Sequence, residues 1–453
     1  MTGTAIQPPP SIAPAARDRR VLTALDVGVL WNDLSLGLLV LVTGALLVPA
    51  LALPVALGAI AIGSLIGCVP LAAVGLAGAR EGLPGMVLFR PVLGRRGSYV
   101  PTALNVAQLL GWTAVEFWAM SRLGNALSKD LLDLDVSWLW LTITAVVCTG
   151  LAIGGPVVVV KRFLERFGTW IVIATGLLLT VTVFISGSVG EGWSRPGEGG
   201  LPFWLAVDLA IVMPVSWLPL VADSTRFARG DRGVFAATFV GYAIGNVWFY
   251  ALGAVLVVSA AAVPSAEGIE LAILGVAGGI AWIVILGLLV GEAPNAFANI
   301  YSTTVSVLNV APSAPTSLMS IVVGAVAFVL AATFTMDRYE VFLFLIGSVF
   351  VPLGGVFLAD YFVRAGGRYG AELVFGPSGE GFRASAFVPW LLGFLVYHWS
   401  VPTGPAGWID AVGSIFTAVG LPFPLLGSRL GASIPSFAVA FVVTLVLTRG
   451  RRT

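Results

Sequence analysis

Charge, histidine and cysteine are all scarce in this sequence. Only 10% of the 453 residues are charged, against about 25% in soluble domains. The single histidine, His398, leaves no basis for a histidine-based metal or catalytic site. The two cysteines, Cys68 and Cys148, lie inside apolar runs, which argues against a disulfide framework or a metal cluster. No GxSxG or HExxH motif occurs either. We therefore expect no enzymatic activity, no metal and no cofactor.

Apolar residues, in contrast, make up 58% of the chain, and the mean hydropathy is +0.98. Apolar runs of 18 residues or more predict transmembrane helices, so the expected fold class is an all-α, polytopic membrane protein. The segments between the runs are too short for a soluble domain, which argues against a scaffold protein. The runs predict about twelve transmembrane helices, at residues 24–50, 54–79, 100–128, 137–160, 163–187, 201–222, 233–263, 277–307, 317–334, 340–363, 384–403 and 430–448.

Basic residues cluster at alternate ends of these spans. Of the 24 Lys and Arg residues, 19 fall on one side, which we call the basic face. By the positive-inside rule this face is cytoplasmic, so both termini are cytoplasmic and the chain is a multi-pass protein of the cell membrane. The Pro/Ala-rich segment 1–20 predicts a disordered cytosolic tail. The clusters of the basic face are Arg17/Arg19/Arg20, Arg80/Arg90/Arg95/Arg96, Lys161/Arg162/Arg166, Arg226/Arg229/Arg232, Arg364/Arg368/Arg383 and Arg449/Arg451/Arg452.

Two of the predicted spans are interrupted. In the first, LWNDLSLGLL, the residues Asp33, Ser35 and Gly37 lower helix propensity within an apolar run. In the sixth, Pro214 removes a backbone donor, which predicts a break near Met213–Ser216. Broken helices at membrane depth line cavities or are buried in protein, and breaks at corresponding positions of two halves are typical of inverted-repeat transporters.

Span three carries a polar stripe. Residues four apart share a helix face, so Gln108, Trp112 and Glu116 form a row that Asn105 extends. A charged, unpaired carboxylate at mid-membrane costs about 2.5–3.5 kcal/mol, so Glu116 must be protonated, hydrogen-bonded or facing water. An amide, a flat ring and a carboxylate in a row predict a site for a flat, polar, nitrogen-rich molecule. The alternative is a set of polar contacts between packed helices.

Span eight carries a second stripe, in the sequence GEAPNAFANIYS. Asn295 and Asn299 share a face, and Glu292 lies one turn before Asn295. Trp217 follows the predicted break in span six and is placed to stack on a ring opposite Trp112. The alternative for each of these side chains is again helix packing.

Five segments together resemble the nucleobase–cation symporter-1 family of cytosine, purine, allantoin and hydantoin permeases, in particular its hydroxymethylpyrimidine and cytosine branch. They are LWNDLSLGLL, GLPGMVLFRPVLGRRGSYVP, NVAQLLGWTAVE, SWLPLVADSTRFAR and EAPNAFANIYS. The resemblance implies a LeuT-like core of five plus five inverted spans in residues 21–363, with halves 21–187 and 201–363. Residues 384–453 would then hold two additional spans and a short cytosolic tail.

The resemblance also implies roles for single residues. The family's stacking tryptophans correspond to Trp112 and Trp217, its polar partner in span three to Glu116, and its substrate amide to Asn299. Backbone exposed at the first break adds candidates there. The predicted substrate-binding residues are Trp112, Glu116, Gln108, Trp217, Asn295, Asn299, Ser35 and Gly37.

The sequence departs from the family at the sodium site. The pattern S-T-N-x-x-A-N of span eight is present as APNAFAN, so Ala293 and Pro294 replace the two residues whose hydroxyls bind Na⁺ in sodium-coupled members. Loss of both oxygens disfavours Na⁺. The protonatable residues Glu116, Glu292 and Asp33 are therefore the candidates for proton coupling.

We expect a symporter that imports a nucleobase or related heterocycle by alternating access, as a monomer in the lipid bilayer and with no nucleic-acid partner. A carboxylate at position 116 favours amino-bearing rings, such as cytosine, adenine or hydroxymethylpyrimidine, over oxo rings such as uracil. The alternatives are a Na⁺-coupled allantoin or hydantoin permease and a channel, although no selectivity loop is visible.

Overall fold

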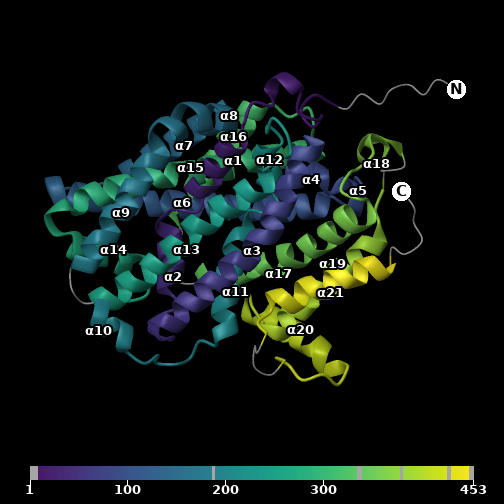
Figure 1. Cartoon of the computed structure of the whole chain (residues 1–453). Coiled ribbons are helices and arrows are strands. Elements are labelled where there is room, and N and C mark those ends of the chain that lie inside the picture. The colour runs from purple at the N-terminus through teal and green to yellow at the C-terminus, as the bar shows by residue number, and fades with distance from the viewer. Residues whose placement is uncertain (1–8, 186–188, 334–338, 378–380, 426–429, 448–453) are drawn as a thin grey trace.

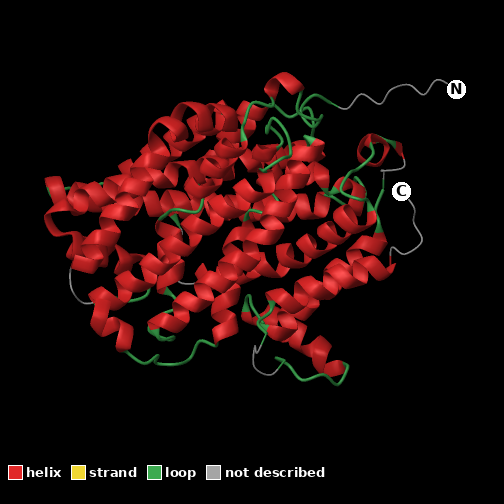
Figure 2. Cartoon of the chain, in the orientation of Figure 1, coloured by secondary structure: helices red, strands yellow, loops and turns green. Residues whose placement is uncertain are grey.

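Figure 1 shows a computed structural model of the chain, which describes residues 9–185, 189–333, 339–377, 381–425 and 430–447. Within these ranges the chain is almost entirely helical, and its β-pairing is an isolated bridge between Leu22 and Ala228 (Figure 2). The helices are η1 (Arg17–Arg19), α1 (Ala24–Asp33), α2 (Leu38–Ala45), α3 (Leu53–Glu81), α4 (Gly85–Leu88), α5 (Arg90–Leu93), α6 (Tyr99–Leu132), α7 (Ser137–Gly154), α8 (Pro156–Val158), η2 (Val159–Gly168), α9 (Thr169–Ile185), α10 (Val189–Ser194), α11 (Phe203–Ser216), α12 (Val221–Thr225), α13 (Val234–Ala260), α14 (Ala266–Ala277), η3 (Gly278–Ile280), α15 (Ala281–Val310), α16 (Thr316–Ala332), α17 (Tyr339–Leu358), η4 (Ala359–Arg364), α18 (Ala371–Phe375), α19 (Ala384–Ser400), α20 (Ala406–Ala418) and α21 (Ser433–Leu447).

Each predicted span contains a helix, and the all-α membrane fold is confirmed. In the described ranges, seven helical segments are long and apolar enough to cross a bilayer, or eight with the bent pair α1–α2. The remaining predicted spans correspond to α6, which is more polar, and to the shorter helices α16, α19 and α21. The count of twelve stays a prediction. Several helices between spans, of which α14 and α20 are the longest, were not expected from the sequence.

Both predicted breaks exist, but one is displaced. The pair α1–α2 bends by 57° at its break, where the interruption was expected. The prediction of a break near Met213–Ser216 is wrong by about one turn, because α11 continues through Pro214 and the interruption lies at Trp217–Leu220. A proline's fixed φ fits a helix, so Pro214 removes one hydrogen bond without ending α11. Pro219 disfavours helical geometry in the residue before it and so ends the helix.

The helices pack as two groups. One group contains α6, α7, α15 and α16, and we call it the α6–α15 group. The other contains α1, α2, α3, α11, α12 and α13, and we call it the α3–α13 group. Glycines allow the second group to pack closely: a Cβ at Gly63 would lie 2.4 Å from the carbonyl oxygen of Val207, and one at Gly253 would lie 1.9 Å from that of Leu41. These contacts favour movement of each group as one unit.

The N-terminal segment is folded against the basic face. Ile12 is buried, Ser11 donates to the carbonyl oxygen of Pro312 at 2.7 Å, and the backbone N–H of Ala15 donates to that of Gly82 at 2.8 Å. The prediction that residues 1–20 form a disordered tail is therefore wrong for residues 9–20, and residues 1–8 lie outside the described ranges. The packing of this segment could not be predicted from its Pro/Ala-rich composition. Single apolar residues and backbone groups make the contacts, and they form no periodic pattern in the sequence.

The additional C-terminal helices are attached to the broken helix α11. Asp208 accepts hydrogen bonds from the backbone N–H groups of Ala432 at 2.6 Å and Ser433 at 3.0 Å, at the start of α21. A carboxylate at a helix N-terminus satisfies N–H groups that have no partner inside the helix. Asp208 therefore has a structural role, and α21 in turn packs on α17 and α19.

Candidate functional site

Polar side chains fix the register of α6 against α15. The two helices are antiparallel: Asn105 on α6 donates to Ser306 on α15 at 2.9 Å, and one turn nearer the basic face Asn309 donates to Thr102 at 2.9 Å. The buried Arg90 locks this end by donating to Asn309 Oδ1 at 2.7 Å. Continuing the same register toward the middle of the membrane brings the stripe of α6 opposite the stripe of α15.

A small cavity lies where these stripes meet the two broken helices. Its volume of about 20 Å³ is enough for a water molecule. A heterocyclic ring is larger, so the lining side chains must move before a ring binds. The lining residues are Leu34, Gly37, Leu39, Val40, Trp112, Glu116, Met213, Trp217, Glu292 and Asn295. The structure thus brings together most of the predicted site. It also adds an apolar wall of Leu34, Leu39, Val40 and Met213, which in the sequence look like ordinary residues of a transmembrane span.

Aromatic side chains hold both predicted stacking tryptophans. The ring of Trp112 lies 5.2 Å from Phe342 and 6.1 Å from Tyr339, both on α17 and both edge-on. The ring of Trp217 lies 6.0 Å from Trp31 on α1, also edge-on. Edge-to-face contacts of this kind stabilise a fixed ring orientation. Sequence reasoning missed the supporting aromatics, because each looks like a packing residue in its own span.

Two carboxyl groups face each other in the cavity. Glu116 and Glu292 are both buried, and both line the same small cavity. Two negative charges in one small buried cavity repel each other, which favours sharing of one proton between the two groups. Glu292 Oε1 also accepts a hydrogen bond from the backbone N–H of Leu38, at the start of α2. The second oxygen of Glu116, Oε2, is buried without a hydrogen-bond partner.

The predicted amides lie at and just below the cavity. Asn295 lines it, whereas Gln108 and Asn299 lie one turn nearer the basic face. Gln108 Nε2 donates to Asn105 Oδ1 at 2.8 Å and to the carbonyl oxygen of Ser216 at 3.0 Å, where α11 ends. Asn299 Nδ2 and Gln108 Oε1 are buried without hydrogen-bond partners. The site therefore offers an unused donor on α15 and an unused acceptor on α6.

Two candidate residues from the first break, Ser35 and Asp33, do not line the cavity. Ser35 donates to the carbonyl oxygen of Asn32 at 2.6 Å and faces Gly245 on α13, not the cavity. Asp33 is fully buried and accepts from Thr169 on α9 at 3.1 Å, while its Oδ2 has no hydrogen-bond partner. Thr169 had no signal in the sequence, because a threonine in an apolar span is common.

The basic face contains a larger cavity, of about 760 Å³, between the N-terminal segment and the ends of α7, α15 and α16. Arg226 and Tyr301 line it, and Arg226 donates to the Tyr301 hydroxyl at 3.0 Å. Asp223 accepts a hydrogen bond from the backbone N–H of Gly85 at 2.8 Å, which joins α12 to the start of α4. These contacts fix the second half of the broken span six to its neighbours.

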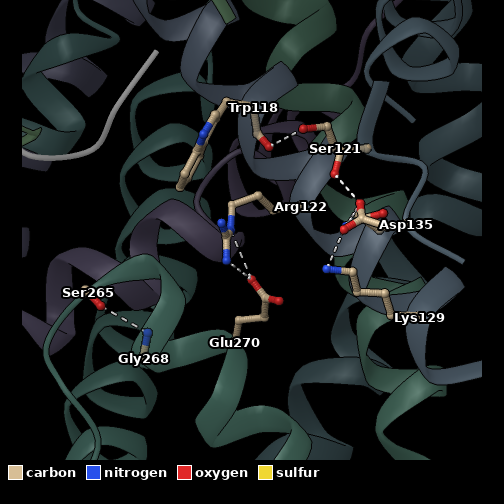
Figure 3. A network of polar contacts seen from close by, with 10 residues as sticks. Trp118, Ser121, Arg122, Lys129, Asp135, Ser265, Gly268 and Glu270 are labelled. Carbon is tan, nitrogen blue, oxygen red and sulfur yellow. Dashed lines mark hydrogen bonds and ion pairs between the residues drawn. The ribbon is translucent and has the colours of Figure 1, made fainter. Parts of the chain in front are cut away.

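Ion pairs hold α6 at the opposite end of the molecule (Figure 3). Arg122 binds Glu270 on α14 at 3.0 Å, and its guanidinium lies 5.5 Å from the centre of the Trp118 ring. Lys129 binds Asp135 at 2.8 Å in the loop that follows α6. These basic residues belong to the few outside the basic face, and the first pair ties α14 to the helix that carries the polar stripe.

Comparison with known proteins gives a consistent result. Residues 14–419 match the sequence profile of the family described as permease for cytosine/purines, uracil, thiamine, allantoin. A Bacillus subtilis protein, YxlA, whose name proposes that it is a purine-cytosine permease, is 26% identical over 430 residues, which is 88% of this chain and 90% of that protein. The hydantoin permease of Microbacterium maritypicum is 23% identical over 376 residues, covering 78% and 76% of the two chains.

The fold is also that of a solved transporter. The structure of Mhp1, a nucleobase-cation-symport-1 family transporter, in a closed conformation with bromovinylhydantoin bound, superposes with a TM-score of 0.81 at 19% identity. The superposition covers 97% of this chain and 95% of that chain. At this level of identity the likeness describes the fold, and the expected LeuT-like architecture is confirmed.

Proposed function

The chain belongs to the family of permeases for cytosine/purines, uracil, thiamine and allantoin, and from this membership we propose that it is a proton-coupled importer of an amino-bearing heterocyclic ring. Like its relatives it is a secondary transporter. Its substrate ring stacks between Trp112 and Trp217, while Glu116, Asn295 and Asn299 contact the ring's polar edge.

One observation carries this assignment: the 20 Å³ cavity at the junction of the two helix groups is lined by both tryptophans, an amide and two carboxyl groups. Stacking on an aromatic side chain is worth about 1–3 kcal/mol per base. A buried polar site rejects rings that leave its groups unpaired, which gives selectivity. The free acceptor Glu116 Oε2 and the free donor Asn299 Nδ2 fit a ring edge with an N–H beside a carbonyl or ring nitrogen.

The composition of the site supports coupling to protons. Ala293 and Pro294 supply no side-chain oxygen for Na⁺, whereas Glu116 and Glu292 place two buried carboxyl groups in the cavity and Asp33 keeps one carboxyl oxygen unpartnered. Transport rather than catalysis is the activity of such a site. The importer works as a monomer in the cell membrane, with the basic face and both termini in the cytoplasm.

A panel of rings in proteoliposomes tests the proposal. Purified protein is reconstituted and tracer uptake of cytosine, adenine, hydroxymethylpyrimidine, uracil, hydantoin and allantoin is measured with an inward proton gradient, in Na⁺ and then in choline. We expect accumulation of an amino-bearing ring that survives the replacement of Na⁺ and collapses when the proton gradient is dissipated. Uptake that requires Na⁺, or that favours hydantoin or allantoin, would identify the alternative, a Na⁺-coupled permease for those rings.

A further inference from the structure

The acid pair and the helix end that contacts it belong to different helix groups. Glu116 on α6 and Glu292 on α15 lie in the α6–α15 group, whereas Leu38 begins α2 of the α3–α13 group. If one group moves against the other, the two carboxyl groups stay together and the start of α2 leaves them. The contact between Leu38 and Glu292 therefore exists in one arrangement of the groups and is lost in another.

A glycine at residue 37 leaves the space that this contact occupies. A Cβ at Gly37 would lie 2.6 Å from Glu292 Oε1 and 3.1 Å from its Oε2. The backbone there is extended, with φ 173°, so space and not backbone strain selects glycine. The bare backbone of Gly37 lets the carboxyl group reach the first N–H groups of α2.

The start of α2 favours the charged form of Glu292. The N–H of Leu38, the first residue of α2, donates to Oε1. N–H groups in the first turn of a helix have no partner inside the helix, and the helix dipole attracts negative charge to that end. The other titratable groups close enough to interact electrostatically with the pair are Asp33 on α1, Tyr339 on α17 and Cys148 on α7.

We propose that the contact between the start of α2 and Glu292 is the switch that links proton binding to the conformational change. While the contact exists, the pair holds one proton. When α2 moves away, Glu292 loses its donors and takes a second proton from the solution to which the site is open. By linkage, protonation of Glu292 weakens its hold on α2, because a neutral carboxyl group accepts a weaker hydrogen bond. The inference rests on the proton coupling of the proposed function.

Hydrogen exchange of the α1–α2 segment tests the switch without a substrate. The purified full chain is exchanged over a series of pH values, and exposed Glu191→Gln serves as the matched acid-to-amide control. For the peptide that contains Leu38 and Leu39, we expect protection, relative to the intrinsic exchange rate, to fall as pH falls, by at most about tenfold per pH unit, the limit for one linked proton. Glu292→Gln should lower this protection and remove its pH dependence, and Gly37→Ala should lower it with the acid still present. A wild-type pH dependence in Glu292→Gln, or none in the wild type, would overturn the proposal.

A transport measurement separates this inference from the proposed function. For the ring that wild-type vesicles accumulate, Glu292→Gln should lose a larger share of the accumulation driven by the proton gradient than of the exchange of labelled for unlabelled ring. Retained accumulation would overturn the switch. If the wild type transports no ring of the panel, the proposed function fails, whereas the hydrogen-exchange result still decides whether Glu292 controls α2.

Discussion

Replacing Trp112 measures how much the stacked ring contributes to binding. Trp112→Ala removes one face of the cavity, while its neighbours Tyr339 and Phe342 remain on α17. At about 1–3 kcal/mol per stacked base, the dissociation constant of the transported ring should rise roughly 5- to 150-fold. Trp112→Phe keeps a flat apolar face and should lose much less. The assay is equilibrium binding of the radiolabelled ring to purified protein.

Trp140 provides the control. It lies on α7, outside the cavity, with its indole N–H donating to Ser128 at 2.7 Å. Trp140→Ala should therefore leave the dissociation constant unchanged, even if the thermal stability of the protein falls. Wild-type affinity in Trp112→Ala, or an equal loss in both variants, would refute the stacking role, since the effect would then be absent or merely structural.

Three further changes test individual contacts. Gln108→Leu removes the hydrogen bond to Ser216 that crosses between the helix groups, and hydrogen exchange at the break of α11 should rise about two- to tenfold; an unchanged rate would show that this bond does not hold the break. Asp208→Ala leaves two N–H groups unpaired at the start of α21 and should cost about 1–3 kcal/mol, seen as a lower melting temperature, and an unchanged one would contradict the capping role. Arg80 holds the pKa of the Asp231 carboxyl below its usual range, so the pair stabilises the protein above the ordinary aspartate pKa and stops doing so as pH falls through the lowered pKa. With solvent screening this amounts to at most about 1 kcal/mol, and the stability difference between wild type and Asp231→Asn should vanish in acid.

The sequence was sufficient for the helices and for the faces they present. Hydropathy locates the spans, and a helical period of four places Trp112 and Glu116 on one face and Asn295 and Asn299 on another. The first break is predictable because polar and glycine residues interrupt an apolar run. The second was misplaced by about a turn because two prolines lie close together, and the one that ends the helix is Pro219.

Contacts between spans could not be predicted from the sequence. Periodicity assigns a residue to a face but does not say which helix that face meets, so Glu116 and Glu292 were separate candidates until the register of α6 on α15 joined them. The roles of Gly37 and of the start of α2 also depend on that juxtaposition. The folded N-terminal segment was missed for a related reason, since its backbone bonds leave no pattern in the side chains.

Uptake by reconstituted vesicles tests the central claim most directly. With an inward proton gradient and choline in place of Na⁺, vesicles containing the wild-type protein should accumulate an amino-bearing ring such as cytosine above its external concentration, and those containing Glu116→Gln should not. Accumulation that depends on Na⁺ and is indifferent to the proton gradient, or that persists in Glu116→Gln, would contradict the account.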